Sequence, residues 1–217
     1  MQRVTKTLRR ALAATTPLSS IPESLLGAAP GESLRSLLVT SGRAGEGKTT
    51  VAIGIAAALA KQPKTSVLLV DASTRDPVLA NWFEVGNEPG FCEWLGADPA
   101  LKDVFHETST SGLYVMSAGA QGAPVATLLA NFPERMQTLL ERFTYVVFDG
   151  DATLSSSGGP LLSRHVDGVV VVAECEKTKR EVVAETRLRL ERAGGRVLGV
   201  VLNKRNFYIP GVFYGKG

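Results

Sequence analysis

The sequence predicts a doubly wound α/β fold, in which a mostly parallel sheet is flanked by helices. Two observations predict it: six short runs rich in valine and leucine, and segments of helical pattern between them. Strands that are apolar at nearly every position are typical of parallel sheets, which are buried on both faces. With 217 residues, of which 44% are hydrophobic, the chain is long enough for one such domain.

Strands and helices alternate from about residue 37 onward. The six predicted strands are 37–40, 66–71, 113–117, 145–149, 168–173 and 197–203. Helices are predicted over 51–61, in a segment after Pro133 that turns Met136, Leu139, Leu140 and Phe143 inward, and over 178–193. Thr178 is the expected N-cap of the last helix, and Gly194-Gly195 its expected end.

A phosphate-binding loop is predicted between the first strand and the first helix. Residues 42–49 match the pattern G-x-x-x-x-G-K-[ST], whose glycines let backbone N–H groups turn inward around phosphate oxygens. Lys48 is expected to reach the terminal phosphates, and the Thr49 hydroxyl to bind Mg²⁺. The predicted nucleotide contacts along the loop are Gly42, Ala44, Gly45, Glu46, Gly47, Lys48, Thr49 and Thr50.

Three predicted strands end on polar side chains suited to nucleotide chemistry. Asp71, Asp149 and Asn203 end the second, fourth and last strands. Parallel strands end at one edge of the sheet, where the two carboxylates could hold Mg²⁺ through its water ligands. Asn203 could hydrogen-bond the adenine edge, or it could simply be a turn residue. ATP and Mg²⁺ are therefore the predicted ligands.

Charge and cysteine content exclude several classes of function. Four basic residues and no acid lie in residues 1–22, and they exceed the net charge of +3, so the rest of the chain is close to neutral. A near-neutral body argues against nucleic-acid binding. Cys92 and Cys175 form no C-x-x-C pair, which suits a reducing cytosol and argues against zinc or a disulfide framework. No stretch approaches the roughly 18 apolar residues of a membrane span.

Three regions are expected along the chain: residues 1–33 as a basic segment and linker, 34–205 as the nucleotide-binding domain, and 206–217 as a short tail. Val4, Leu8 and Leu12 have the spacing of an amphipathic helix. That segment could rest on an anionic membrane surface, dock on a membrane protein, or be a solvated tail.

The motifs Gly45-Glu46-Gly47-Lys48-Thr49, Val-Leu-Leu-Val-Asp-Ala-Ser-Thr-Arg-Asp-Pro at 67–77 and Val-Val-Phe-Asp at 146–149 together resemble the bacterial tyrosine kinases (BY-kinases) of capsule and exopolysaccharide export. The resemblance covers about residues 35–203. Each motif by itself is shared with the wider superfamily of partition and division-site ATPases, which carry a deviant Walker A loop.

The resemblance implies an ATP-dependent enzyme in which Lys48 and Thr49 bind the nucleotide. It implies that Asp71 coordinates Mg²⁺ and helps to activate the attacking hydroxyl, and that Asp149 also serves the metal. It further implies a membrane polysaccharide co-polymerase as partner, a homodimer or ring, and a cytoplasmic place at the inner face of the membrane. Members phosphorylate a tyrosine-rich C-terminal tail in trans.

The sequence departs from the family pattern at several places. Ser73 stands where Asp-x-Asp-x-Arg has its second acid, and Asp149-Gly150-Asp151-Ala152 replaces Asp-x-Pro-Pro. The tail holds only Tyr208 and Tyr214. The ring motif E-x-x-R-x-x-R is half present, as Glu32 and Arg35, with Leu38 in the third place. Nucleotide binding is expected to survive these changes, whereas tyrosine phosphorylation is left open.

Arg43 lies five residues before Lys48, where partition-type ATPases carry a lysine that reaches the partner's nucleotide. It could stabilise phosphates across a dimer, or it could be a surface arginine. Three functions are therefore weighed: a tyrosine autokinase of exopolysaccharide synthesis, an ATP-dependent switch in the same pathway, and a partition-type positioning ATPase. An ATP-binding protein of the polysaccharide pathway is favoured.

Overall fold

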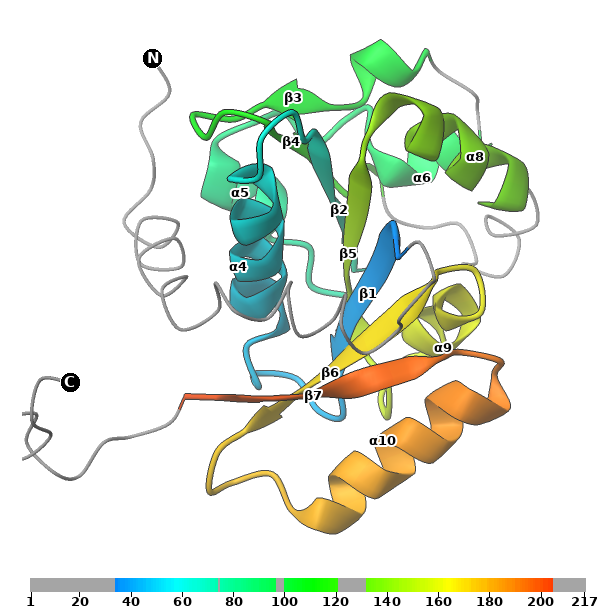
Figure 1. Cartoon of the computed structure of the whole chain (residues 1–217). Helices are drawn as coiled ribbons and strands as arrows, with labels where there is room; N and C mark the ends of the chain where they lie inside the picture. Colours follow the sequence, from blue (N-terminus) through cyan, green and yellow to red (C-terminus); the bar gives the residue numbers. More distant parts are fainter. Residues whose placement is uncertain (1–33, 74, 97–99, 121–131, 205–217) are drawn as a thin grey trace, which may run out of the picture.

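The computed structural model describes residues 34–73, 75–96, 100–120 and 132–204. Among these residues, seven strands form one sheet in the order β3-β4-β2-β5-β1-β6-β7, and every neighbouring pair is parallel except β3 with β4 (Figure 1). The strands are β1 (Ser36–Ser41), β2 (Val67–Ala72), β3 (His106–Glu107), β4 (Leu113–Met116), β5 (Tyr145–Ala152), β6 (Gly168–Glu174) and β7 (Val197–Asn203). The predicted mostly parallel, doubly wound sheet is confirmed.

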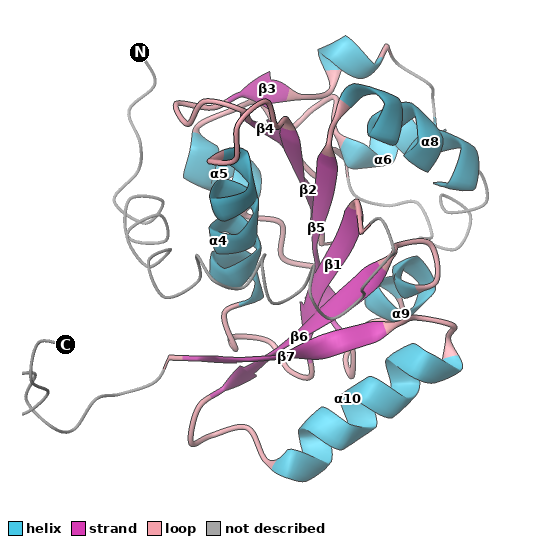
Figure 2. Ribbon diagram, viewed as in Figure 1, coloured by secondary structure: helices cyan, strands magenta, loops and turns pink. Residues whose placement is uncertain are grey.

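Helices cover both faces of the sheet (Figure 2). The helices are α4 (Lys48–Ala60), α5 (Leu79–Phe83), α6 (Phe91–Gly96), the 3₁₀ helix η1 (Leu101–Asp103), α8 (Phe132–Arg142), α9 (Gly158–Ser163) and α10 (Arg180–Arg192). Apolar side chains of α4 and α5 share one core cluster with the sheet, whereas those of α6, α8, α9 and α10 share a second one. The sheet therefore separates two hydrophobic cores, as a three-layer α/β domain requires.

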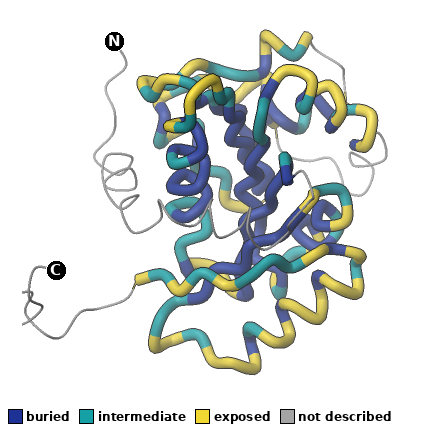
Figure 3. The backbone as a smooth tube through the Cα atoms, in the orientation of Figure 1, coloured by how far each residue is buried: buried dark blue, intermediate teal, exposed yellow. Residues whose placement is uncertain are grey.

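Helix α4 is buried almost all round, and this burial positions the phosphate loop. Its sequence contains five alanines and a glycine, so the backbone can approach the strands closely, and nine of its thirteen residues are buried. Figure 3 shows this helix and the central strands as the most buried part of the fold. A helix that is apolar on all sides is stable only inside a core. The N-terminus of α4 is thereby held at the carboxyl edge of β1.

The predicted elements agree with the structure apart from their ends and the shortest segments. Strand β5 continues to Ala152, so Asp149 lies within the strand and not at its end. Helix α10 begins after Lys179; Thr178 is not its cap, because the Thr178 hydroxyl donates to Glu46 instead. Gly194, at φ +90°, ends this helix as predicted. The prediction missed β3, α5, α6, η1 and α9, which are too short to show a period.

Arg35, expected as half of a ring motif, acts inside the domain. Its guanidinium donates to the carbonyl groups of Leu140, Phe143 and Thr144, at and just beyond the end of α8. The last carbonyls of a helix lack partners within it, so a cation that binds them caps the helix. Leu38, in the third place of the motif, is fully buried. The predicted N-terminal helix, Glu32 and the tail tyrosines lie outside the described residues.

Within the described ranges, no helix combines the length and apolar character that crossing a bilayer requires.

Candidate nucleotide site

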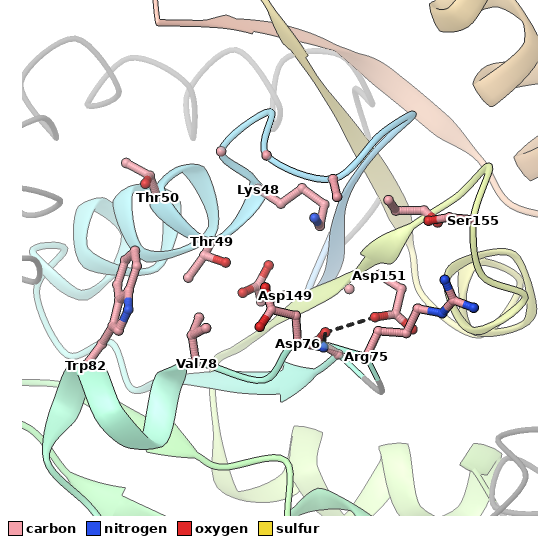
Figure 4. A pocket seen from close by; sticks show the side chains of 16 residues that line it. Lys48, Thr49, Thr50, Arg75, Asp76, Val78, Trp82, Asp149, Asp151 and Ser155 are labelled. Carbon is pink, nitrogen blue, oxygen red and sulfur yellow. Dashed lines mark hydrogen bonds between the residues drawn. The ribbon is translucent and has the colours of Figure 1, made fainter. Parts of the chain in front are cut away.

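A pocket of about 260 Å³ opens at the carboxyl edge of the sheet (Figure 4). Its walls come from the phosphate loop and the start of α4, from the segment after β2, and from the end of β5 with the loop that follows it. Among the predicted loop contacts, the pocket is lined by Ala44, Gly45, Gly47, Lys48, Thr49 and Thr50. Polar groups from three elements thus converge at the edge where α/β folds bind their ligands.

Two glycines in the loop adopt left-handed backbone conformations that other residues rarely take. Gly45 has φ +83° and Gly47 has φ +93°, and Gly47 directly precedes α4. The φ at position 47 strongly favours glycine, and a Cβ atom there would also lie 2.0 Å from the Asn203 side-chain nitrogen and displace it. This path presents backbone N–H groups at a helix N-terminus, a site that favours anions.

Glu46 and Asn203 hold the loop from behind and do not line the pocket. The buried Glu46 carboxylate accepts hydrogen bonds from the Arg43 backbone N–H and from the Thr178 hydroxyl. The Asn203 side chain donates to the Glu46 carbonyl oxygen at 3.0 Å. These contacts anchor the loop to the segment after β6 and to the end of β7. A contact of Asn203 with adenine stays a prediction.

Gly42 and Arg43 lie outside the pocket as well. A Cβ atom at Gly42 would meet Val182 and Thr186 of α10 at 2.7 Å, so this glycine allows the loop to pack closely on that helix. The Arg43 side chain is exposed. An exposed guanidinium beside the loop is compatible with both alternatives for Arg43, and its action across a dimer stays a prediction.

Asp71 is buried beneath the pocket, next to the acid on the neighbouring strand. Its Oδ2 accepts hydrogen bonds from the backbone N–H groups of Val78 and Leu79 at 2.9 Å, at the start of α5, and its Oδ1 accepts one from Ser73. Burial raises its pKa to about 6, although these hydrogen bonds oppose the shift. The structure thus shows Asp71 organising the segment after β2, and its predicted catalytic role is untested.

Asp149 faces the pocket beside Lys48 and Thr49 (Figure 4). Burial, followed by the charge of Asp71, raises its pKa to about 7, while Thr49 and Lys48 act in the opposite direction. Among the described side chains, its Oδ1 is the buried polar atom without a hydrogen-bond partner. Because leaving a buried carboxylate oxygen unsatisfied is costly, this atom is suited to bind a cation.

The donor set fits magnesium bound together with a nucleotide. The described residues contain no group of three His, Cys, Asp or Glu side chains that could hold a metal ion by themselves. Magnesium seldom needs one, since it is usually held by one or two carboxylates together with phosphate oxygens and water. Thr49 and Asp149 are the residues placed to provide the protein's share.

Asp151 is one of the pocket residues that the sequence did not identify as functional. It is only 4% exposed and lines the pocket; its Oδ1 accepts a hydrogen bond from the Ser73 hydroxyl and its Oδ2 one from Ser156, both at 2.8 Å. The second acid of Asp149-x-Asp151 could have identified it, because it follows Asp149 closely at the same end of the strand; regular alternation does not place it there, since β5 is irregular against β1 at this point.

Comparison with known proteins also indicates a nucleotide-binding domain. The profile of the CobQ/CobB/MinD/ParA nucleotide binding domain matches residues 37–207. A tyrosine-protein kinase, CpsD of Streptococcus agalactiae, is 30% identical over 179 residues, which are 81% of this chain and 78% of CpsD. The chain belongs to the bacterial tyrosine kinase family within this nucleotide-binding class.

Solved kinase domains of this tyrosine kinase family have the same fold. The kinase domain of VpsO superimposes with a TM-score of 0.79 at 31% identity, covering 91% of this chain and 97% of that domain. The kinase domain of the Escherichia coli tyrosine kinase ETK gives a TM-score of 0.80 at 25% identity, covering 91% and 79%. This sequence departs from the family pattern at Ser73 and at Asp151, and the structure shows that these two side chains form a hydrogen bond with each other.

Proposed function

We propose that this chain binds ATP with Mg²⁺ and transfers the γ-phosphoryl group to tyrosine in an exopolysaccharide or capsule pathway. The observation that carries the proposal is the unpartnered buried oxygen of Asp149, in a pocket shared with Lys48 and Thr49. Membership of the tyrosine kinase family supports this choice among phosphoryl-transfer reactions.

In the proposed reaction, a tyrosine oxygen bonds to the γ-phosphorus while the bond from that phosphorus to the bridging oxygen breaks and ADP leaves. The phenolic proton passes to a pocket carboxylate or to solvent. The loop amides and the Lys48 ammonium would hold the phosphates and stabilise the charge on the transferred group. Bound Mg²⁺, held by Thr49 and Asp149, would neutralise charge on the phosphate oxygens.

The proposed partner is a membrane polysaccharide co-polymerase or chain-length regulator, with the chain at the inner face of the bacterial membrane. A homodimer or ring would bring one subunit's tyrosine to another subunit's pocket. Arg43 would then reach the phosphates of the neighbouring subunit, because its side chain is exposed next to the loop.

A second candidate is an ATP-dependent switch in the same pathway that does not phosphorylate protein. It is favoured by one observation: Ser73, which lines the pocket, provides a hydroxyl where the family pattern has a carboxylate. A site with one acid fewer after β2 could bind nucleotide and change shape without activating a tyrosine.

The test is incubation of the purified full chain with Mg²⁺ and ATP labelled in the γ-phosphate, followed by phosphotyrosine detection and measurement of released phosphate. Label on tyrosine, abolished in Lys48→Ala and retained in Lys102→Ala, is the expected result. Lys102 is an exposed lysine of η1 away from the pocket. Phosphate release without labelled tyrosine would select the switch, and neither signal would overturn both.

A further inference from the structure

Ser73 and Asp151 form a hydrogen-bonded pair that joins the ends of two strands inside the pocket. We propose that Asp151, oriented by Ser73, is a positioning residue for the nucleotide's divalent cation: it supplies the carboxylate charge that position 73 lacks. The inference rests on the proposed nucleotide binding, and it does not depend on whether the phosphoryl group goes to tyrosine.

The first argument is the way in which Asp151 is held. Its two carboxylate oxygens accept hydrogen bonds from Ser73, in the segment after β2, and from Ser156, in the loop after β5. Ser156 also accepts a hydrogen bond from the Gly158 backbone N–H at the start of α9. Two hydroxyls from separate segments therefore fix a side chain that is 96% buried, so its orientation is set before any ligand binds.

The second argument is the charge that gathers in this corner. Asp71, Asp149 and Asp151 are all buried, at the carboxyl ends of the neighbouring strands β2 and β5. Burying several carboxylates together is costly unless a cation is recruited. A divalent cation that arrives with a nucleotide would supply that charge.

The third argument is that positions 73 and 151 are interchangeable in space. The Ser73 hydroxyl lies 2.8 Å from an Asp151 oxygen, and both residues line the pocket. An acid at either position would therefore place its charge in nearly the same volume. This chain has a serine on the β2 side and an aspartate on the β5 side, so a single acid serves the pair.

The experiment measures nucleotide affinity as a function of Mg²⁺, which requires no catalysis. The full chain is titrated with a fluorescent derivative of ADP in EDTA and then across a range of Mg²⁺ concentrations. In Asp151→Asn, which keeps the size of the side chain, we expect metal-free ADP to bind at least as tightly as in wild type, because a negative charge near the phosphates is gone. The Mg²⁺ concentration for half-maximal enhancement should rise roughly ten-fold, the loss typical of a residue that supports a metal site.

A swap and two controls complete the design. The double variant Ser73→Asp/Asp151→Ser returns an acid to the other side of the pair and should recover most of the Mg²⁺ enhancement. Ser73→Ala, which frees Asp151 to reorient, should shift the Mg²⁺ midpoint by a smaller factor. Asp103→Asn removes an exposed acid of η1 and should leave the curve unchanged.

The experiment distinguishes failure of the inference about Asp151 from failure of the proposed nucleotide binding. If Asp151→Asn weakened binding equally with and without Mg²⁺, or if the swap did not recover the enhancement, Asp151 would be a structural residue only and the inference would be wrong. If the wild type bound no nucleotide at all, the proposed function would fail first. Thermal unfolding of each variant in EDTA shows whether it is folded, and the swap tests the idea even where the single variant is unstable.

Discussion

Asp71 on β2 and Asp149 on β5 are register partners in adjacent parallel strands, so their side chains leave the same face of the sheet at the same level. Both are nearly inaccessible to solvent, and the charge of Asp71 raises the cost of ionising Asp149. Such a pair is unfavourable in the ligand-free protein and becomes favourable when a cation binds. The nucleotide site is thus expected to have a cost in stability.

The first prediction concerns the pH dependence of stability without ligand. The pKa values of Asp71 and Asp149 rise from 3.8 to about 6 and about 7 on folding. Between pH 4 and pH 7 the folded chain therefore binds more protons than the unfolded chain, and stability falls as pH rises. From pH 5 to pH 8 this contribution should cost about 2 to 4 kcal/mol.

Chemical denaturation at several pH values in EDTA measures this slope. Asp149→Asn should be more stable than wild type at pH 8 and should show a flatter profile, while its affinity for Mg²⁺ with nucleotide falls. Asp103→Asn, which changes an exposed acid, should keep the wild-type slope. A wild-type protein that gained stability from pH 5 to pH 8 through these two groups would contradict the burial argument.

The second prediction concerns the conformation of the phosphate loop. Gly47→Ala should reduce nucleotide affinity at least ten-fold and lower stability by about 1 to 3 kcal/mol, because alanine is strained at φ +93° and its Cβ would strike Asn203. Gly199→Ala is the matched control, since a Cβ there meets no atom within 4 Å. Equilibrium binding and denaturation measure the two effects. Normal affinity in Gly47→Ala would show that the loop adopts another path.

The third prediction concerns Arg35 as a helix cap. Arg35→Ala should lower the free energy of unfolding by about 1 to 3 kcal/mol, because charged hydrogen bonds to the carbonyls at the end of α8 are lost. Arg187→Ala, which removes an exposed ion pair with Glu191, should cost less than about 0.5 kcal/mol. If Arg35→Ala were as stable as wild type but changed the oligomer, the ring role expected from the motif would be the better explanation.

The fourth prediction concerns Arg43 across a proposed dimer. Arg43→Ala should leave nucleotide affinity of the monomer within about two-fold, because the side chain is exposed and does not line the pocket. It should reduce ATP-dependent dimerisation and phosphate release, which sedimentation and a phosphate assay measure. Arg187→Ala is again the control. Unchanged dimerisation and unchanged phosphate release would assign Arg43 to the surface.

Much of the site could be predicted because the phosphate loop is formed by residues that are close together in the sequence. The residues of the loop are consecutive, and their glycines specify the conformation of the backbone whatever surrounds them. The buried strands could be predicted for a similar reason, since their apolar character is continuous. Asp71 and Asp149 could be assigned to one edge of the sheet because each follows the apolar run of a predicted parallel strand.

Other features depended on contacts between segments that are distant in sequence. The role of Arg35 required the end of α8, more than 100 residues away, and that of Glu46 required Thr178. In the sequence, Ser73 and Asp151 are two separate positions at which the family pattern is not kept. Only the hydrogen bond between their side chains shows that they form one unit.

The sequence by itself determined that the chain forms a parallel α/β domain with a phosphate loop, because local periodicity and glycine placement encode both. Tertiary structure decided which polar residues face the nucleotide pocket and which only hold the loop in place. The reason is physical: a side chain's hydrogen-bond partner and its burial are properties of the packed sheet, and neither exists until the strands are aligned in register.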